Sequence, residues 1–253
     1  MYFYNNLQWK IVFIFSILLI VCPEASELLA EDRDILEIGN FSAAKEGGDF
    51  PSGWELLAFK KIKQHTKYEM VNDDGAVVVK AESKSSSSGL IKNIRINPKK
   101  YPVVSWRWKA TNLYEKGDVS KKEGDDYPAR IYITFEYDPA KLSLFERLKF
   151  NVVKVLYGKY PPVAAINYIW ESKASEGTMV PNSYTNRVIM IVAESGETKL
   201  NTWVQEEHNI LEDYKKAFGE DPPFISGIAI MTDSDNTKES AITYYGDIIF
   251  KRR

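Results

Sequence analysis

The chain has 253 residues, of which 44% are hydrophobic and 27% charged, a composition that indicates a globular protein and excludes a disordered or fibrous chain. A formal net charge of −2 argues against a nucleic acid or an anionic lipid as partner. One cysteine and two histidines are too few for a zinc site built on these residue types, and neither histidine lies in a recognisable nucleophile motif.

The first elements in chain order are a positive charge at Lys10 and an apolar run at 11–22 that ends in Cys22. This run is short for a membrane span and is typical of a signal-peptide core, although a buried core helix is the alternative. We expect a signal peptide at 1–30, a linker at 31–49 and a single domain at 50–253. The protein is then exported, periplasmic or secreted, with no stable membrane span after processing. Lipidation of Cys22 stays open, because Val21 is not the small residue normally found there.

Strand patterns follow from residue 50 onward, each bounded by Gly, Pro, Asn, Asp or Ser. Asp73, Asp74 and Gly75 indicate a tight hairpin turn between two of these strands. We expect the first strand to pair with the last and close the fold. The expected strands are 54–60, 67–71, 76–82, 89–96, 103–110, 129–137, 165–170, 187–193, 202–207, 225–232 and 241–250.

Two helices interrupt the strands. Apolar residues recur at helical spacing over 142–157. The second helix begins after Asn209, which with Glu212 forms a capping-box pattern, and it ends at Gly219. Many strands, two short helices and no alternation of strand and helix predict a mainly β fold. We expect an antiparallel β-sandwich of jelly-roll or galactose-binding-like type.

Strand alternation places candidate site residues on particular faces. Arg130 and Tyr132 share one face of the strand at 129–137, and Arg107 shares a face with Lys109 on the strand at 103–110. If these strands are neighbours, these four side chains and Glu136 form one polar, aromatic-bearing face. The alternative is that this face is simply the solvated side of the sheet. Asn167 and Trp170 are expected at the edge of the site, on opposite faces of a third strand.

Asp125 and Asp126 are adjacent acids four to five residues before Arg130, and adjacent carboxylates repel unless a cation or a base is near. Three interpretations stay open. The acids could bond Arg130 and fix the turn into the strand. They could bind calcium or sugar hydroxyls. They could also serve as acid and base in catalysis, which needs a separation that sequence does not give.

A second acidic cluster holds Asp233, Asp235 and Asn236. Alternate oxygen side chains in a loop suit calcium, but the cluster lacks the Gly and distal Glu of an EF-hand loop. Asp and Asn are also the usual residues of tight turns. A metal is therefore one of two interpretations of this loop, and calcium is the only cofactor we consider.

Several blocks occur in order and carry a family resemblance. They are WRWK at 106–109, EKGD at 115–118, EGDDYPARIYITFEYDP at 123–139, NYIW at 167–170, EDYKKAFGEDPP at 212–223 and SGIAIMTDSDNT at 226–237. Together they resemble an uncharacterised bacterial family, domain-of-unknown-function family 3047, over most of the chain from about residue 50. The resemblance implies a bacterial exported protein and a strand pattern like that of jelly-roll carbohydrate-binding domains, but it brings no activity and no site residues.

The residues and the resemblance favour an exported domain that binds a glycan or another polyhydroxyl ligand in the cell envelope. The expected ligand-binding residues are Arg107, Asp125, Asp126, Arg130, Tyr132, Asn167 and Trp170. One alternative is a polysaccharide hydrolase or lyase that uses Asp125 or Asp126 with Arg130. A second alternative is a structural or assembly protein whose aromatic face meets another protein.

Overall fold

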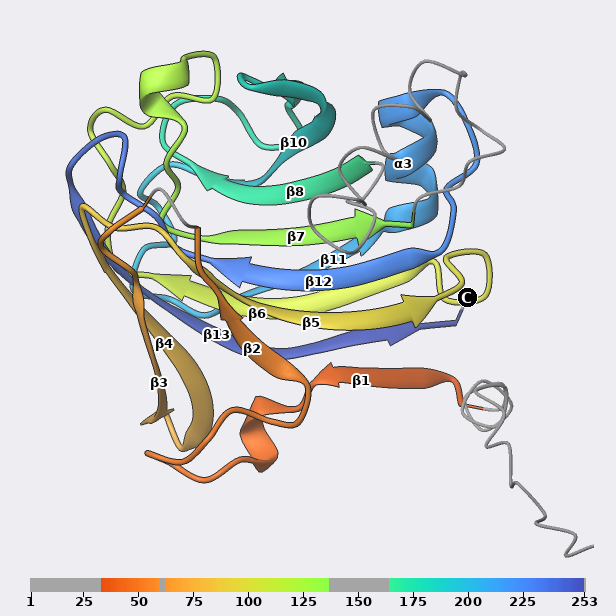
Figure 1. Ribbon diagram of the computed structural model, residues 1–253, viewed down its shortest axis with the longest axis horizontal. Coiled ribbons are helices and arrows are strands. Elements are labelled where there is room, and N and C mark those ends of the chain that lie inside the picture. Colours follow the sequence, from red (N-terminus) through yellow and green to blue (C-terminus); the bar gives the residue numbers. More distant parts are fainter. Residues whose placement is uncertain (1–32, 60–61, 137–163, 253) are drawn as a thin grey trace, which may run out of the picture. The chain divides into compact units, whose positions relative to one another are not determined.

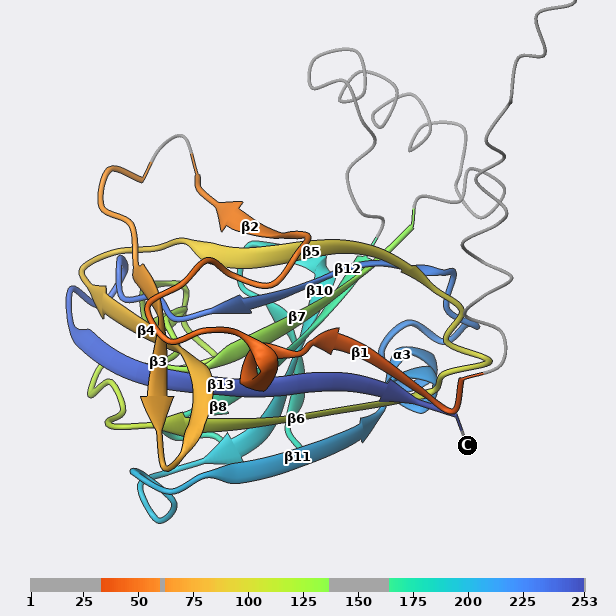
Figure 2. The same cartoon turned by 90° about the horizontal axis from the view of Figure 1, so that it is seen from below.

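The computed structural model describes residues 33–59, 62–136 and 164–252, and within them two β-sheets pack face to face (Figures 1 and 2). The mainly β sandwich predicted from the sequence is confirmed. In the six-stranded sheet the order is β11 (Val204–Asn209), β6 (Val103–Ala110), β13 (Ser240–Lys251), β4 (Ala76–Lys84) and β3 (Lys67–Asp73), with β1 (Ile35–Gly39) also paired to β13. In the seven-stranded sheet the order is β2 (Trp54–Leu57), β5 (Gly89–Ile96), β12 (Ile225–Met231), β7 (Arg130–Phe135), β8 (Ala164–Glu171), β10 (Thr185–Ser195) and β9 (Met179–Asn182).

The pairing of the last strand differs from the expectation. β13 pairs with β4 along its first half and with β1 along its second half, whereas β2 pairs with β5 in the other sheet. The expectation of a linker at 31–49 therefore does not hold for Ile35–Gly39. This strand contributes a buried Ile38, whose carbonyl accepts a hydrogen bond from the Trp54 indole at 3.1 Å. A strand of five residues with so little buried surface leaves a weak pattern in the sequence.

One strand pair is parallel, although we expected an antiparallel sandwich. β9 and β10 form an antiparallel hairpin, and β10 lies between β9 and β8, so that β10 runs parallel to β8. β9 has four residues and is absent from the predicted strands. The parallel pair follows from the path of the chain, which leaves β8, crosses to the edge of the sheet and returns through β10.

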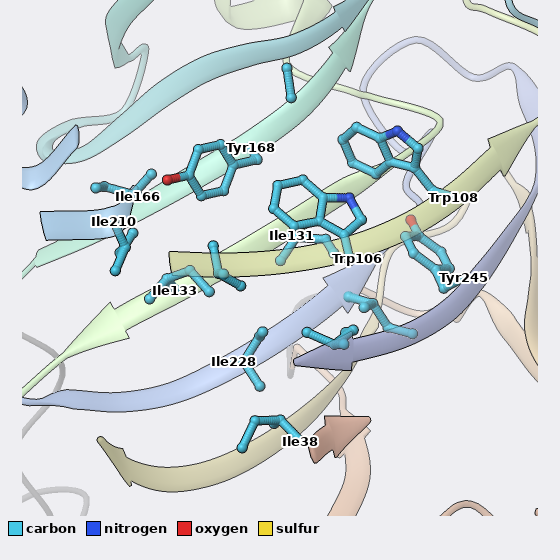
Figure 3. Close-up of a cluster of buried hydrophobic side chains, with 14 of the residues drawn as sticks. Ile38, Trp106, Trp108, Ile131, Ile133, Ile166, Tyr168, Ile210, Ile228 and Tyr245 are labelled. Atoms are coloured by element: carbon cyan, nitrogen blue, oxygen red, sulfur yellow. The ribbon is translucent and has the colours of Figure 1, made fainter. Parts of the chain in front are cut away.

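The core between the sheets is rich in aromatic rings (Figure 3). Trp106 of β6 lies 5.2 Å from Tyr168 of β8, and Trp108 lies 6.0 Å from Trp170, measured between ring centroids. The apolar face of β6 thus packs directly on β8 of the opposite sheet. Burial of such large side chains is the main term that holds two sheets together.

The local turn and cap signals are confirmed. Asp74 and Gly75 both have positive φ, 52° and 84°, as a two-residue hairpin turn requires. In α3 (Ile210–Phe218) the Asn209 side chain accepts from the Glu212 N–H, and Gly219 ends the helix in the left-handed conformation. The helix expected at 142–157 lies outside the described residues. Among the residues described, no helix has the length and apolar character needed to span a membrane.

Candidate functional site

The two acidic segments meet at one end of the seven-stranded sheet. Arg130 begins β7 and Met231 ends β12, and these two residues are paired in register. Because the strands are antiparallel, the segment before β7 and the segment after β12 must leave the same edge. Tyr127 N–H donates to Asp233 Oδ1 at 3.2 Å. The sequence presents these segments as two separate clusters, and the strand register joins them into one site.

Arg130 is the centre of the contacts at this edge and is only 2% exposed. Its Nε donates to Asp233 Oδ1 at 2.7 Å, and its Nη2 donates to the other Asp233 oxygen and to the Asp125 carbonyl. Its Nη1 donates to Tyr132 Oη at 2.8 Å, and the guanidinium lies over the ring of Tyr127. A bidentate pair of this kind is a strong, oriented contact. Of the three interpretations, the structural Asp–Arg bond exists: Asp125 Oδ1 lies 3.8 Å from Arg130 Nη1, but the closer, bidentate contact comes from Asp233.

The polar face of β7 is buried because a second layer covers it. Tyr127 and Val119 pack on Ile169 and Met190 of the sheet. Glu171, which is fully buried, anchors this layer by accepting from the backbone N–H groups of Val119, Lys173 and Ala174. The solvated face that an antiparallel strand commonly presents is therefore absent at Arg130.

Burial changes the acid strength of two carboxyls here. Burial raises the pKa of Asp126, although the Thr237 N–H and the charge of Arg130 act in the opposite direction. Burial also raises the pKa of Asp233, and the Arg130 guanidinium opposes that rise. Thr237 N–H donates to Asp126 Oδ2 at 2.6 Å, so Asp126 fixes the loop after β12.

A pocket of about 700 Å³ opens beside Arg130. Its lining combines carboxylates and amides with aromatic and apolar side chains. Tyr184, from the turn between β9 and β10, is 55% exposed, and Phe59 is 38% exposed. The polar lining residues are Ser87, Asp125, Arg130, Asp233, Asp235 and Asn236, and the others are Ala58, Phe59, Ile62, Tyr132, Tyr184 and Met231. The pocket therefore offers hydrogen-bond acceptors beside ring faces.

Buried hydroxyls and a backbone hydrogen bond hold the acidic loop against β4, the loop between β4 and β5, and the residue before β3. Ser234 Oγ lies 2.8 Å from Ser83 Oγ, and Ser234 N–H donates to the Ser86 carbonyl at 2.9 Å. Thr66 Oγ1 donates to the Thr232 carbonyl at 2.7 Å. The composition of the serine run at 85–88 predicts only a loop. The serine run belongs to the site because Ser86 contacts Ser234 of the acidic loop and Ser87 lines the pocket.

Seven of the ten expected ligand and metal residues gather at this edge. Asp125, Arg130, Tyr132, Asp233, Asp235 and Asn236 line the pocket, while Asp126 is buried and is not part of the lining. The Asn236 side chain donates to the Asp125 carbonyl at 3.2 Å.

Three expected ligand residues do not join the pocket lining. Arg107 lies in the other sheet, where its guanidinium covers Trp203 at 4.6 Å, because β6 and β7 are not neighbours. Trp170 points into the core against Trp108. Asn167 is opposite Tyr132 in register, but it is fully buried and its amide N–H points to the Met190 sulfur at 3.4 Å.

Sequence reasoning missed the apolar part of the pocket. Ala58 and Phe59 follow β2, and Tyr184 lies in the turn that joins β9 to β10. An exposed aromatic in a turn has no periodic signal, so only the three-dimensional arrangement identifies it.

Fold and site together define a two-sheet β-sandwich with an acidic, aromatic-rimmed pocket at one sheet edge. A family model described as "Protein of unknown function (DUF3047)" matches residues 52–249, and the chain belongs to this family. No match was found among the curated proteins.

Proposed function

We propose that this protein is an exported ligand-binding domain whose pocket beside Arg130 takes a glycan or a similar polyhydroxyl molecule in the cell envelope. Export is supported by the sequence pattern of Lys10 and the apolar run that ends at Cys22. The binding role is supported by the composition of the pocket.

The observation that carries this proposal is the pairing of acceptors with ring faces in one cavity. Asp125, Asp235 and Asn236 line the pocket, and their side chains carry oxygens that accept hydrogen bonds. Tyr132, Tyr184 and Phe59 present aromatic surface to the same space. Sugars have hydroxyl edges that donate hydrogen bonds and apolar C–H faces that pack on aromatic rings, so this lining matches both sides of a sugar ring.

The contacts of Arg130 favour binding over catalysis. Its side chain donates to Asp233, Tyr132 and the Asp125 carbonyl, so the guanidinium is committed to protein groups. A group that stabilises charge in a transition state must point at the substrate. Asp126, one of the two acids considered for catalysis, is 1% exposed and bonded to the loop after β12.

A melting experiment tests the proposal. The purified protein is heated with a panel of neutral and acidic oligosaccharides, because a ligand that binds only the folded state raises the melting temperature. We expect a rise with one class of glycan, and no rise with any class would contradict the proposal. Release of new reducing ends from that glycan, lost in Asp125→Asn, would establish the hydrolase or lyase alternative instead. A flat panel together with a specific copurifying protein would favour the assembly role.

A further inference from the structure

Three carboxylates converge beside the pocket, and two of them, Asp233 and Asp235, belong to its lining. One oxygen from each of Asp126, Asp233 and Asp235 lies within 4.8 Å of the other two. Calcium binds oxygen ligands at roughly 2.3–2.6 Å, so ligands on opposite sides of the ion are about 4.8 Å apart. The three oxygens are therefore close enough to share one ion without rearrangement of the backbone.

The charge of this cluster is only partly balanced. Arg130 pairs with Asp233. Among the described residues, neither Asp126 nor Asp235 has a lysine or arginine nitrogen within 4.0 Å of its carboxylate. Like charges held this close repel unless a cation is near. One guanidinium thus stands against three carboxylates.

A buried oxygen without a partner points to the same place. Asp126 is 1% exposed, and its Oδ1 accepts no hydrogen bond from any residue that the structure describes. A buried carboxylate oxygen without a partner is costly, and coordination of a cation removes that cost.

Tyr114 supplies a second buried oxygen of this kind. Its side chain is 1% exposed and its hydroxyl has no hydrogen-bond partner within the described part of the chain. Burial raises the pKa of Tyr114, and the charges of Asp233 and Asp126 add to that rise. The charges of the cluster therefore act on this buried hydroxyl.

We propose that Asp126, Asp233 and Asp235 bind one calcium ion beside the pocket. All three ligands are hard carboxylate oxygens, which suit calcium rather than zinc or copper. Asp233 is held in position by Arg130, and Asp126 by the Thr237 N–H. Because Asp233 and Asp235 also line the pocket, the ion is reachable from it.

Calcium alone tests this site, without any sugar, so the result does not depend on the proposed glycan function. The full chain is stripped with chelator and melted with and without calcium chloride. At a calcium concentration about 100 times the dissociation constant, the melting temperature should rise by roughly 5–10 °C. Asp126→Asn and Asp235→Asn should each abolish most of the rise. Asp74→Asn, in the hairpin between β3 and β4, is the matched control and should keep it.

Two results would overturn the site. One is an unchanged melting temperature of the folded wild-type protein at millimolar calcium. The other is a rise of equal size in wild type, Asp126→Asn and Asp235→Asn, which would place the calcium elsewhere. A larger rise with magnesium than with calcium would contradict the assignment of the ion. Asp235→Asn keeps the test valid if Asp126→Asn fails to fold, since Asp235 is only half-buried.

Discussion

Replacement of Arg130 by methionine should destabilise the fold by several kcal/mol. The substitution removes the bidentate contact to Asp233 and the bonds to Tyr132 and the Asp125 carbonyl, while it leaves the buried Asp233 carboxylate without a guanidinium. Removal of one partner of a buried ion pair costs about 3–5 kcal/mol. For a domain of this size that corresponds to a melting temperature lower by roughly 6–20 °C.

Urea unfolding followed by tryptophan fluorescence measures this cost, and a double-mutant cycle assigns it. Asp233→Asn alone should lower the free energy of unfolding. The double variant Arg130→Met with Asp233→Asn should lose about 0.5–3 kcal/mol less than the two single losses added together, because it no longer holds an unpaired Asp233 carboxylate. The control is Arg107→Met, which removes a guanidinium stacked on Trp203 in the other sheet and should cost only about 0.5–1 kcal/mol. The reasoning is refuted if Arg130→Met costs no more than Arg107→Met, or if the cycle is additive.

Three further predictions concern the loops that build the pocket. Because burial raises the pKa of Asp126, the native state holds its proton to a higher pH than the unfolded chain, so ionised Asp126 opposes folding above that pKa. In chelator at pH 7, the melting temperature of Asp126→Asn should be higher than that of wild type. This difference in melting temperature should vanish as the pH falls through the raised pKa of Asp126. A difference that stays constant with pH would contradict the raised pKa. Gly124→Ala would place a Cβ 2.7 Å from Asp118 N and 2.8 Å from the Lys116 carbonyl oxygen. Urea unfolding should therefore show a free energy of unfolding lower by about 1–3 kcal/mol. An unchanged free energy of unfolding would disprove the close approach. Glu171→Ala leaves three backbone N–H groups without their acceptor. In the same assay the free energy of unfolding should fall by at least about 2 kcal/mol. A smaller fall would mean that other acceptors replace the Glu171 carboxylate.

Much of the fold is readable from local signals in the sequence. The strands Gly89–Ile96 and Val103–Ala110 have the predicted bounds, since alternation and flanking turn residues are strong there. The caps of α3 are equally local, because Asn209 and Gly219 each act within one helical turn. The short strands β1 and β9 give no such signal, since four or five residues bury too little to show a period.

The site is predictable in its parts and not in its assembly. The sequence marks the acids at 125–126 and 233–235, yet only the register of Arg130 with Met231 brings them together. The prediction that Arg107 joins the site depends on β6 being a neighbour of β7, and it is wrong because strand order is a long-range property that alternation does not encode. The rim residues Phe59 and Tyr184 come from connecting segments, where the pattern carries no such information.

The most direct test of a glycan site in this pocket is the affinity of two tyrosine variants for the oligosaccharide that stabilises the protein best. Tyr184 is 55% exposed at the pocket rim, so Tyr184→Ala should leave the melting temperature almost unchanged. Tyr244→Ala, on β13 of the other sheet, is the matched control. In titration calorimetry we expect Tyr184→Ala to weaken binding about tenfold, as the loss of one ring that stacks on a sugar implies, with Tyr244→Ala close to wild type. Equal affinity of wild type and Tyr184→Ala would contradict the pocket as the binding site.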